Sequence, residues 1–242
     1  MMILLLIAAV LPAALLWLYI WRKDQQPEPT PWLVKAVLYG VGICIPVAIV
    51  EAVLSAALFG ETGQPTSLIG TTAEAFLVAA IPEETGKLLV LWMLLRRNPY
   101  FDEHFDGIVY AVSVSLGFAA IENVFYIVGS EGDWFSVAVS RALLAVPGHY
   151  AFAVFMGFYY SLWHFTGRPR RYAVLMLLVP VVAHGVYDAL ALSGQVNEYV
   201  GGVCFLVLVF FCVKMHKRVQ QKVLAHLQHD REQGSDYEEI IS

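Results

Sequence analysis

Long apolar runs dominate this sequence, and they constrain its fold more than any other feature. Seven segments are apolar over most of their length, and short connections rich in turn-forming residues separate them. A helix needs about 20 mostly apolar residues to cross a bilayer. Since 59% of the residues are hydrophobic and only 14% are charged, an ordinary soluble domain is excluded. The predicted spans cover residues 2–20, 34–59, 72–95, 106–129, 135–163, 171–193 and 199–213.

The sequence therefore predicts an all-α, polytopic transmembrane helix bundle of about seven spans, placed in the cell membrane. Basic residues follow spans one, three, five and seven, whereas the intervening loops carry no Lys or Arg. The positive-inside rule then predicts an outside N-terminus and a cytoplasmic C-terminus. The first run resembles a signal peptide in composition, but it lacks a basic start and ends in Trp21-Arg22-Lys23. We interpret it as a retained span.

The chain shows no internal repeat and no second soluble domain. We expect a transmembrane domain over residues 1–213, with a motif-bearing core over 72–193, and a short, partly disordered cytoplasmic tail over 214–242. The net charge of -5 gives no indication of nucleic-acid binding. None of the three cysteines has CxxC spacing, so a zinc knuckle or disulfide framework is not expected. Five histidines near the cytoplasmic side are expected to be solvated: His104, His164, His216, His226 and His229.

Ionisable side chains inside four successive spans are the candidate functional residues. Each costs on the order of 2.5–3.5 kcal/mol to insert at mid-membrane. A rise of 1.5 Å per residue places Glu84 and His149 near the midplane of the membrane, His184 slightly outward, and Glu122 and Asp188 roughly 7–9 Å outward. The spans run in alternating directions, yet their polar residues fall in one layer of the membrane. We therefore infer a shared polar cavity that opens toward the outer face. The set comprises Glu83, Glu84 and Lys87 in span three, Glu122 in span four, His149 in span five, and His184 and Asp188 in span six.

Each of these groups also has a purely structural interpretation. The spacing of Glu83 and Glu84 from Lys87 allows an intrahelical ion pair. A single buried histidine, or a His-x-x-x-Asp pair, is often a hydrogen-bonded packing element. We interpret Glu51 and Arg141 as structural or interfacial residues. The joint pattern on four helices favours a functional site.

Prolines accompany three of the sites. Pro82 precedes Glu83, Pro147 lies two residues before His149, and Pro180 lies one turn before its span's histidine. A proline frees a carbonyl and bends a helix. The bends are expected to open space for the water that hydrolysis inside a bilayer requires.

The set is suited to peptide hydrolysis, which needs an activated water, oxyanion stabilisation and protonation of the leaving amine. A carboxylate in an apolar pocket can serve as base and then as acid. The sequence contains neither HExxH nor G-x-S-x-G, so the familiar zinc-protease helix and a serine mechanism are not expected. Zn²⁺ is a candidate cofactor, because histidine and carboxylate groups are its usual ligands. The candidate ligands, or oxyanion donors without a metal, are Glu122, His149, His184 and Asp188.

Three short motifs carry a family resemblance. Glu83-Glu84-Thr85-Gly86-Lys87 matches EExxK, Phe118 to Glu122 matches FxxxE, and His184 to Asp188 matches HxxxD. Together they resemble the PrsW family of intramembrane proteases, related to the CAAX-prenyl-protease superfamily, over roughly residues 34–213. Where the second motif of the superfamily ends in His, this chain has Glu122, which leaves open whether a metal is used.

The resemblance implies a membrane-embedded endopeptidase whose substrate is a single-span membrane protein. Enzymes of this family make the first cut in a membrane-anchored anti-sigma factor. By motif position Glu83 and Glu84 would be catalytic, and His184 would be catalytic or a ligand. The alternatives are a proton- or metal-coupled transporter and a catalytically inactive membrane receptor.

We also expect a division of labour between the two glutamates. Adjacent residues on a helix point about 100° apart, so both cannot face the scissile bond equally. Lys87 is expected to hold one of them ionised and to leave the other free to activate water. Glu84 lies nearer the midplane, which favours it as the general base.

Overall fold

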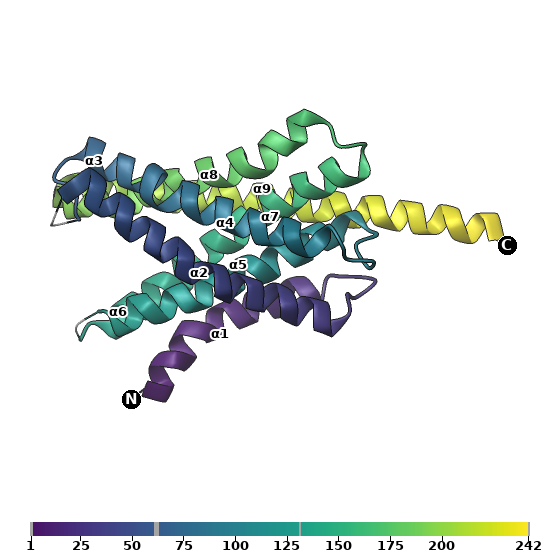
Figure 1. The fold of residues 1–242 in the computed structure, drawn as a ribbon, viewed down its shortest axis with the longest axis horizontal. Helices are drawn as coiled ribbons and strands as arrows, with labels where there is room; N and C mark the ends of the chain where they lie inside the picture. The colour runs from purple at the N-terminus through teal and green to yellow at the C-terminus, as the bar shows by residue number, and fades with distance from the viewer. Residues whose placement is uncertain (1, 61–62, 131, 242) are drawn as a thin grey trace.

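The chain folds as a bundle of long helices (Figure 1). The computed structural model describes residues 2–60, 63–130 and 132–241, and these residues form helices and connections without a β-strand. The elements are, in chain order, α1 Met2–Trp21, α2 Thr30–Phe59, α3 Leu68–Ala73, η2 Glu74–Ala80, α4 Ile81–Leu95, α5 His104–Val128, α6 Trp134–Ser140, η3 Arg141–Ala145, α7 Val146–Phe165, α8 Arg170–Leu192, η4 Ser193–Gln195 and α9 Glu198–Ile241.

Within the described residues, six helical segments are long and apolar enough to cross a membrane, and they correspond to six of the seven predicted spans. The predicted span 72–95 lies in the helical stretch of α3, η2 and α4. This stretch carries Glu74, Glu83, Glu84 and Lys87. Because of these charged residues it is less apolar than the six segments and is not counted among them. The multi-pass, all-helical class is confirmed, while the count of seven and the orientation stay predictions.

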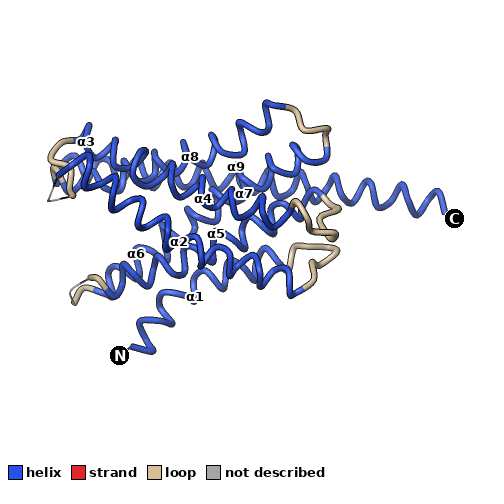
Figure 2. Tube along the Cα trace, in the orientation of Figure 1, coloured by secondary structure: helices blue, strands red, loops and turns tan. Residues whose placement is uncertain are grey.

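The connections gather at two opposite ends of the bundle (Figure 2). The α1–α2, α4–α5 and α7–α8 connections lie at the end from which the C-terminal part of α9 projects. We call this the basic-loop end, because those connections and α9 carry most of the Lys and Arg residues. The α2–α3, α5–α6 and α8–α9 connections lie at the other end. This alternation agrees with the pattern of charges along the sequence.

Helix α5 lies at the centre of the bundle and packs against α7, α2 and α1 (Figure 1). Most of its side chains are buried. The α5–α7 crossing is close because glycines face each other: a Cβ on Gly157 would lie 2.3 Å from the carbonyl oxygen of Gly107. A larger residue at either position would push apart the two helices that carry Glu122 and His149.

Two widened helical turns precede the prolines that lead into the site. The π-helix η2 ends just before Ile81-Pro82, and the π-helix η3 ends just before Val146-Pro147. Proline lacks an N–H and its ring clashes with the carbonyl four residues earlier. A π turn accommodates that mismatch, and such turns are frequent at functional sites. The prolines therefore widen their helices locally instead of ending them, and Glu83 and His149 follow directly.

The C-terminal helix α9 is continuous from Glu198 to Ile241. The predicted domain boundary at residue 213 is therefore not marked by a break in the helix. Val219, Val223 and His226 on its second half are buried, so this part of the tail packs onto the bundle. The predicted disorder of the last ten residues concerns side chains that lie almost entirely outside the described part of the chain.

Candidate active site

Five of the seven predicted polar residues line one cavity of about 830 Å³ between α2, η2, α4, α5, α7 and α8. Its wall also reaches Gly63, Gln64 and Gln195, which belong to the α2–α3 and α8–α9 connections, and these connections lie at the end opposite the basic-loop end. The shared cavity and its direction of opening thus agree with the depth argument from the sequence. The site residues on its wall are Glu83, Glu122, His149, His184 and Asp188.

The ammonium group of Lys87 lies at the centre of the buried cluster. Its Nζ donates to Glu83 Oε2 and to Glu84 Oε1, each at 2.8 Å, and lies 3.1 Å from His149 Nδ1. These partners use all three N–H donors of the ammonium. The centroid of the Phe118 ring lies 4.3 Å from the same nitrogen, which gives the FxxxE phenylalanine a cation–π role.

The expectation that Lys87 holds only one glutamate is wrong. Glu83 and Glu84 precede it by four and three residues, and both positions lie within reach on the helix surface. What separates the two glutamates is their access to the cavity. Glu83 lies on the cavity wall, whereas the side chain of Glu84 is completely buried. Depth along the helix favoured Glu84 as the base, but the direction of the side chains favours Glu83.

His149 is held between two charged groups. Its Nε2 lies 2.8 Å from Glu122 Oε2, and its Nδ1 faces Lys87. Because an ammonium can only donate, the neutral ring accepts at Nδ1 and donates from Nε2–H to the carboxylate. Glu122 therefore selects the tautomer of His149 and fixes the orientation of its ring.

Arg141 belongs to the site, although the sequence interpretation treated it as structural or interfacial. It lines the cavity, and one of its terminal nitrogens donates to Glu122 Oε2 at 2.6 Å. Its Nε donates to Asn123 Oδ1, and Asn123 in turn donates to the carbonyl of Ala9 on α1. A sequence signal for this role existed, because an arginine inside a span requires a carboxylate partner. Glu122 was one such carboxylate, because no cation had been assigned to it.

His184 bridges two carboxylates. Its Nδ1 lies 3.0 Å from Glu84 Oε1 and its Nε2 lies 3.1 Å from Asp188 Oδ2. A ring that donates to both oxygens is the imidazolium. The ring of Phe152 stacks on it at a centroid distance of 4.8 Å, a contact that the sequence gave no reason to expect.

The glycine of the HxxxD motif brings α8 close to η2. A Cβ on Gly185 would lie 2.5 Å from the ring of Phe76. This close approach lets the neighbouring His184 reach Glu84 on the following helix. The motif therefore contributes packing as well as chemistry.

The charges of the cluster are nearly balanced within the protein. Its carboxylates belong to Glu83, Glu84, Glu122 and Asp188, and its cations are Lys87, Arg141 and the His184 imidazolium. Side-chain exposure rises from 0% at Glu84 to 21% at Asp188. The site is thus a buried network of ion pairs that is most exposed near Asp188.

A metal would compete with Lys87. The ligand atoms offered by Glu83, Glu84 and His149 lie within 4.8 Å of one another, and carboxylate and imidazole are zinc ligand types. The same three groups contact the Lys87 ammonium, so one cation already stands where a second would converge. Of the four ligands predicted from the sequence, His149 joins this group. The ligand roles of Glu122, His184 and Asp188 stay predictions.

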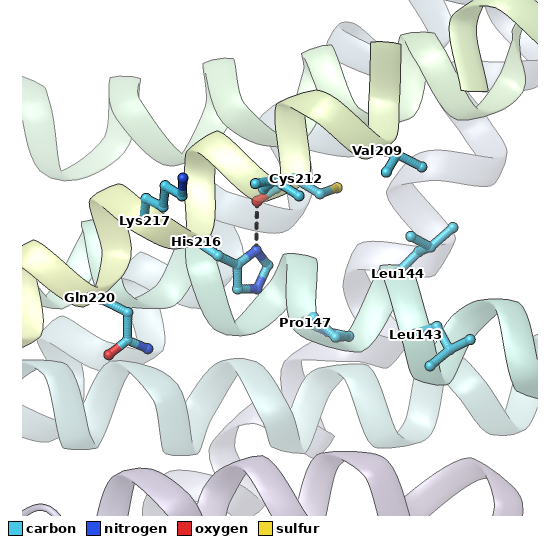
Figure 3. Close-up of a pocket in the computed structure, with 9 residues that line it drawn as sticks. Leu143, Leu144, Pro147, Val209, Cys212, His216, Lys217 and Gln220 are labelled. Carbon is cyan, nitrogen blue, oxygen red and sulfur yellow. Dashed lines mark hydrogen bonds between the residues drawn. The ribbon is translucent and has the colours of Figure 1, made fainter. Parts of the chain in front are cut away.

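A separate hollow lies on the outer side of the bundle between η3, α7 and α9 (Figure 3). Apolar side chains such as Leu143 and Leu144 dominate its lining. Its histidine, His216, donates from Nδ1 to the carbonyl of Cys212 on the same helix at 2.8 Å. None of the charged groups of the cluster lines this hollow, and it is not part of the candidate site.

Comparisons with known proteins agree with the three motifs. The family described as PrsW family intramembrane metalloprotease matches residues 28–215. The chain is 36% identical to a protein named Protease PrsW from Geobacillus kaustophilus, over 88% of this chain and 91% of that protein. It is 30% identical to the protein of that name from Clostridioides difficile, over 94% and 93%, and 34% identical to that from Bacillus subtilis, over 82% and 88%. No solved structure matches the chain.

Proposed function

The chain belongs to the PrsW family of intramembrane proteases, and on that premise we propose that Glu83 activates a water molecule to hydrolyse a peptide bond in the cavity. The observation that carries this proposal is the placement of Glu83. Its carboxylate lies on the cavity wall and at the same time receives a hydrogen bond from Lys87. It is thus within reach of water and fixed in orientation, as a general base requires.

The proposed reaction balances within the side chains present. The Glu83 carboxylate takes a proton from water, and the oxygen of that water attacks the carbonyl carbon of the peptide. The carbon–nitrogen bond of the tetrahedral intermediate then breaks. The protonated Glu83 returns its proton to the leaving amine, which yields a carboxylic acid and a free amine.

Glu84 has a positioning role in this proposal. It is buried, bonded to Lys87 and bonded to His184. It therefore ties the EExxK helix to the HxxxD helix and sets the place of the ammonium. Lys87 in turn fixes the orientation of the Glu83 carboxylate through its hydrogen bond at 2.8 Å.

The oxyanion of the intermediate requires donors that are not already engaged. The ring nitrogens of His149 and His184 face protein partners. Arg141 lines the cavity and has more N–H donors than the two that contact Glu122 and Asn123. We assign its remaining donors to the developing negative charge, which such preorganised groups stabilise.

The family is described as one of metalloproteases, which implies a metal ion. Glu83, Glu84 and His149 would hold it, with Lys87 displaced from their midst. A zinc ion there would act as a Lewis acid on the scissile carbonyl and acidify its bound water. The positioning of His149 by Glu122 and of His184 by Asp188 is the same in either case.

The substrate is a membrane protein, because the family acts within the bilayer. We further propose that it is a single-span protein, and, by the resemblance of the motifs, a membrane-anchored anti-sigma factor. A cavity that reaches one end of the bundle can admit an unwound segment of such a span. The transporter and inactive-receptor alternatives are not favoured by the family match.

The test compares matched glutamine variants in cells that express the chain. Newly formed peptide termini inside predicted transmembrane segments would be identified by mass spectrometry of the membrane fraction. Glu83→Gln is expected to abolish them, while the same substitution at Glu51, which also lines the cavity, should retain them. Wild-type cleavage by Glu83→Gln would overturn the assignment of the base. Repeating the assay on purified protein with a chelator shows whether cleavage requires the metal.

A further inference from the structure

A second cluster of imidazole and carboxylate groups lies at the basic-loop end, where the second half of α9 packs against the start of α5. The centroid of the His104 ring lies 4.2 Å from that of His229 and 5.3 Å from that of His226. His104 Nδ1 lies 3.5 Å from Asp230 Oδ1. This cluster is at the opposite end of α5 from Glu122 and shares no residue with the catalytic cavity.

These groups are not the solvated side chains that the sequence predicts. His104 and His226 are only 8% and 3% exposed, because α9 continues as a helix and covers the first turn of α5. The carboxylate of Asp230 accepts the backbone N–H of His104 at 3.1 Å and that of Phe105 at 2.8 Å. It therefore caps α5 and is held in a fixed place beside the histidines.

The geometry fits a small cation. Ligand atoms of His104, His229 and Asp230 all lie within 4.8 Å of one another. Two imidazoles and one carboxylate are a ligand set typical of Zn²⁺. A hollow of about 410 Å³, lined by both of these histidines, His226 and Gln233, gives access to the cluster.

Further carboxyl groups lie close to this cluster. Asp24, Glu103 and Asp106 offer carboxylate oxygens within 4.8 Å of one another, and Asp230 lies close enough to raise the pKa of Asp24 and Glu103, although burial is the larger cause. Among the described residues, no Lys or Arg forms an ion pair with any of these acids. A divalent ion bound beside these carboxyl groups would favour their ionised form.

We propose that His104, His229 and Asp230 bind one divalent transition-metal ion, with Zn²⁺ as its representative, and that this ion fastens the C-terminal helix to the start of α5. Two of the ligands are neighbours on α9 and the third begins α5. Metal at this site therefore links two segments that are far apart in the sequence. The site is independent of the proposed hydrolysis.

The test uses the full-length protein purified in detergent and stripped with a chelator. Zn²⁺ alone is then added, and bound metal is measured by equilibrium dialysis with elemental analysis. His104→Ala and His229→Ala should each lose one equivalent relative to wild type. His216→Ala is the matched control, since His216 lies on the same helix with its ring bonded to Cys212, and it should lose none. Measuring each variant also in a His149→Ala background separates this equivalent from any metal in the catalytic cavity.

A second measurement keeps the proposal falsifiable if a variant loses its fold. Hydrogen exchange of the backbone over residues 214–233 should slow when Zn²⁺ is added to the wild-type protein, and His229→Ala should abolish that slowing. Unchanged exchange in wild type, or full metal binding by both His104→Ala and His229→Ala, overturns the proposal. A protein without proteolytic activity leaves these readouts unaffected, so failure of the proposed function is recognised separately.

Discussion

Two buried clusters of acidic residues in the described part of the chain are neutralised in different ways. In the catalytic cluster Glu83 and Glu84 share Lys87, and Glu122 is bonded to Arg141. At the basic-loop end the acids cap backbone groups or accept from neutral donors. Asp106, for example, accepts the N–H groups of Asp102 and Glu103 at 3.1 and 2.8 Å. No described Lys or Arg forms an ion pair with this second group.

The difference shows what each cluster requires. A buried carboxylate is expensive unless a cation or several donors accompany it. The catalytic cluster supplies its cations from its own helices, so it can keep charged groups inside a bilayer without help. The acids at the basic-loop end depend on protons or on cations from solution. The first cluster is therefore expected to respond to mutation, and the second to solution conditions.

Removal of Lys87 should have the largest effect. In Lys87→Met, Glu83 and Glu84 remain buried without their cation, which costs about 3–5 kcal/mol of unfolding free energy. Cleavage should be lost as well. Chemical unfolding in detergent micelles measures the stability, and Lys35→Met, at an exposed position, is the control. Adding Glu83→Gln and Glu84→Gln to Lys87→Met should restore stability but not activity; if it restores neither, the ion pairing is not the cause of the loss.

Arg141 is expected to matter for rate more than for stability. Arg141→Met removes the proposed oxyanion donor and releases Glu122, and loss of one such donor typically lowers kcat by about 10²–10³. KM should change little, because the oxyanion forms only in the transition state. Arg141→Lys keeps the charge and should recover part of kcat. Equal losses in both variants with a raised KM would instead indicate a role in substrate binding.

The parts of the structure that were predicted from the sequence are those that repeat along it. Long apolar runs gave six of the spans, and helical rise placed the polar residues of four helices in one layer. Which cation neutralises which carboxylate was harder to predict, because the pairing depends on the direction of each side chain. Arg141 and Glu122 come from different helices, and only packing shows that they meet. The same packing decides that Glu83, and not Glu84, lines the cavity.

The cluster at the basic-loop end could not be predicted for a related reason. Its histidines and Asp230 come from the start of α5 and the tail, and the neighbouring acids include Asp24 from the α1–α2 connection. A polar tail is ordinarily solvated, and nothing in residues 214–232 alone shows that this one covers His104. The docking depends on a few apolar positions such as Val219 and Val223, both fully buried.

Solution pH should affect the second cluster. Burial raises the pKa of Glu28 to about 7, that of Glu103 to about 7 and that of Asp24 to about 6. A carboxyl whose folded-state pKa is raised contributes stability at low pH and loses it as pH rises through the folded value. In chelator, Tm should therefore fall by several degrees between pH 5.5 and pH 8.5. A Tm that is constant over this range would mean that these acids have a cation partner after all.

The smallest effect, and the sharpest test of the contrast, is expected from Glu28→Gln. The hydroxyl of Tyr110 donates to Glu28 Oε2, and an amide oxygen can accept the same bond. At pH 5.5, below the raised pKa of about 7, the wild-type carboxyl is largely protonated, and the variant should have nearly the same Tm. At pH 8.5 the wild type must bury a charge and the variant need not, so the variant should have the higher Tm. Glu198→Gln, at an exposed position, should change Tm at neither pH. If Glu28→Gln lowers Tm at pH 8.5, then the ionised Glu28 is paired, and the two clusters are neutralised in the same way.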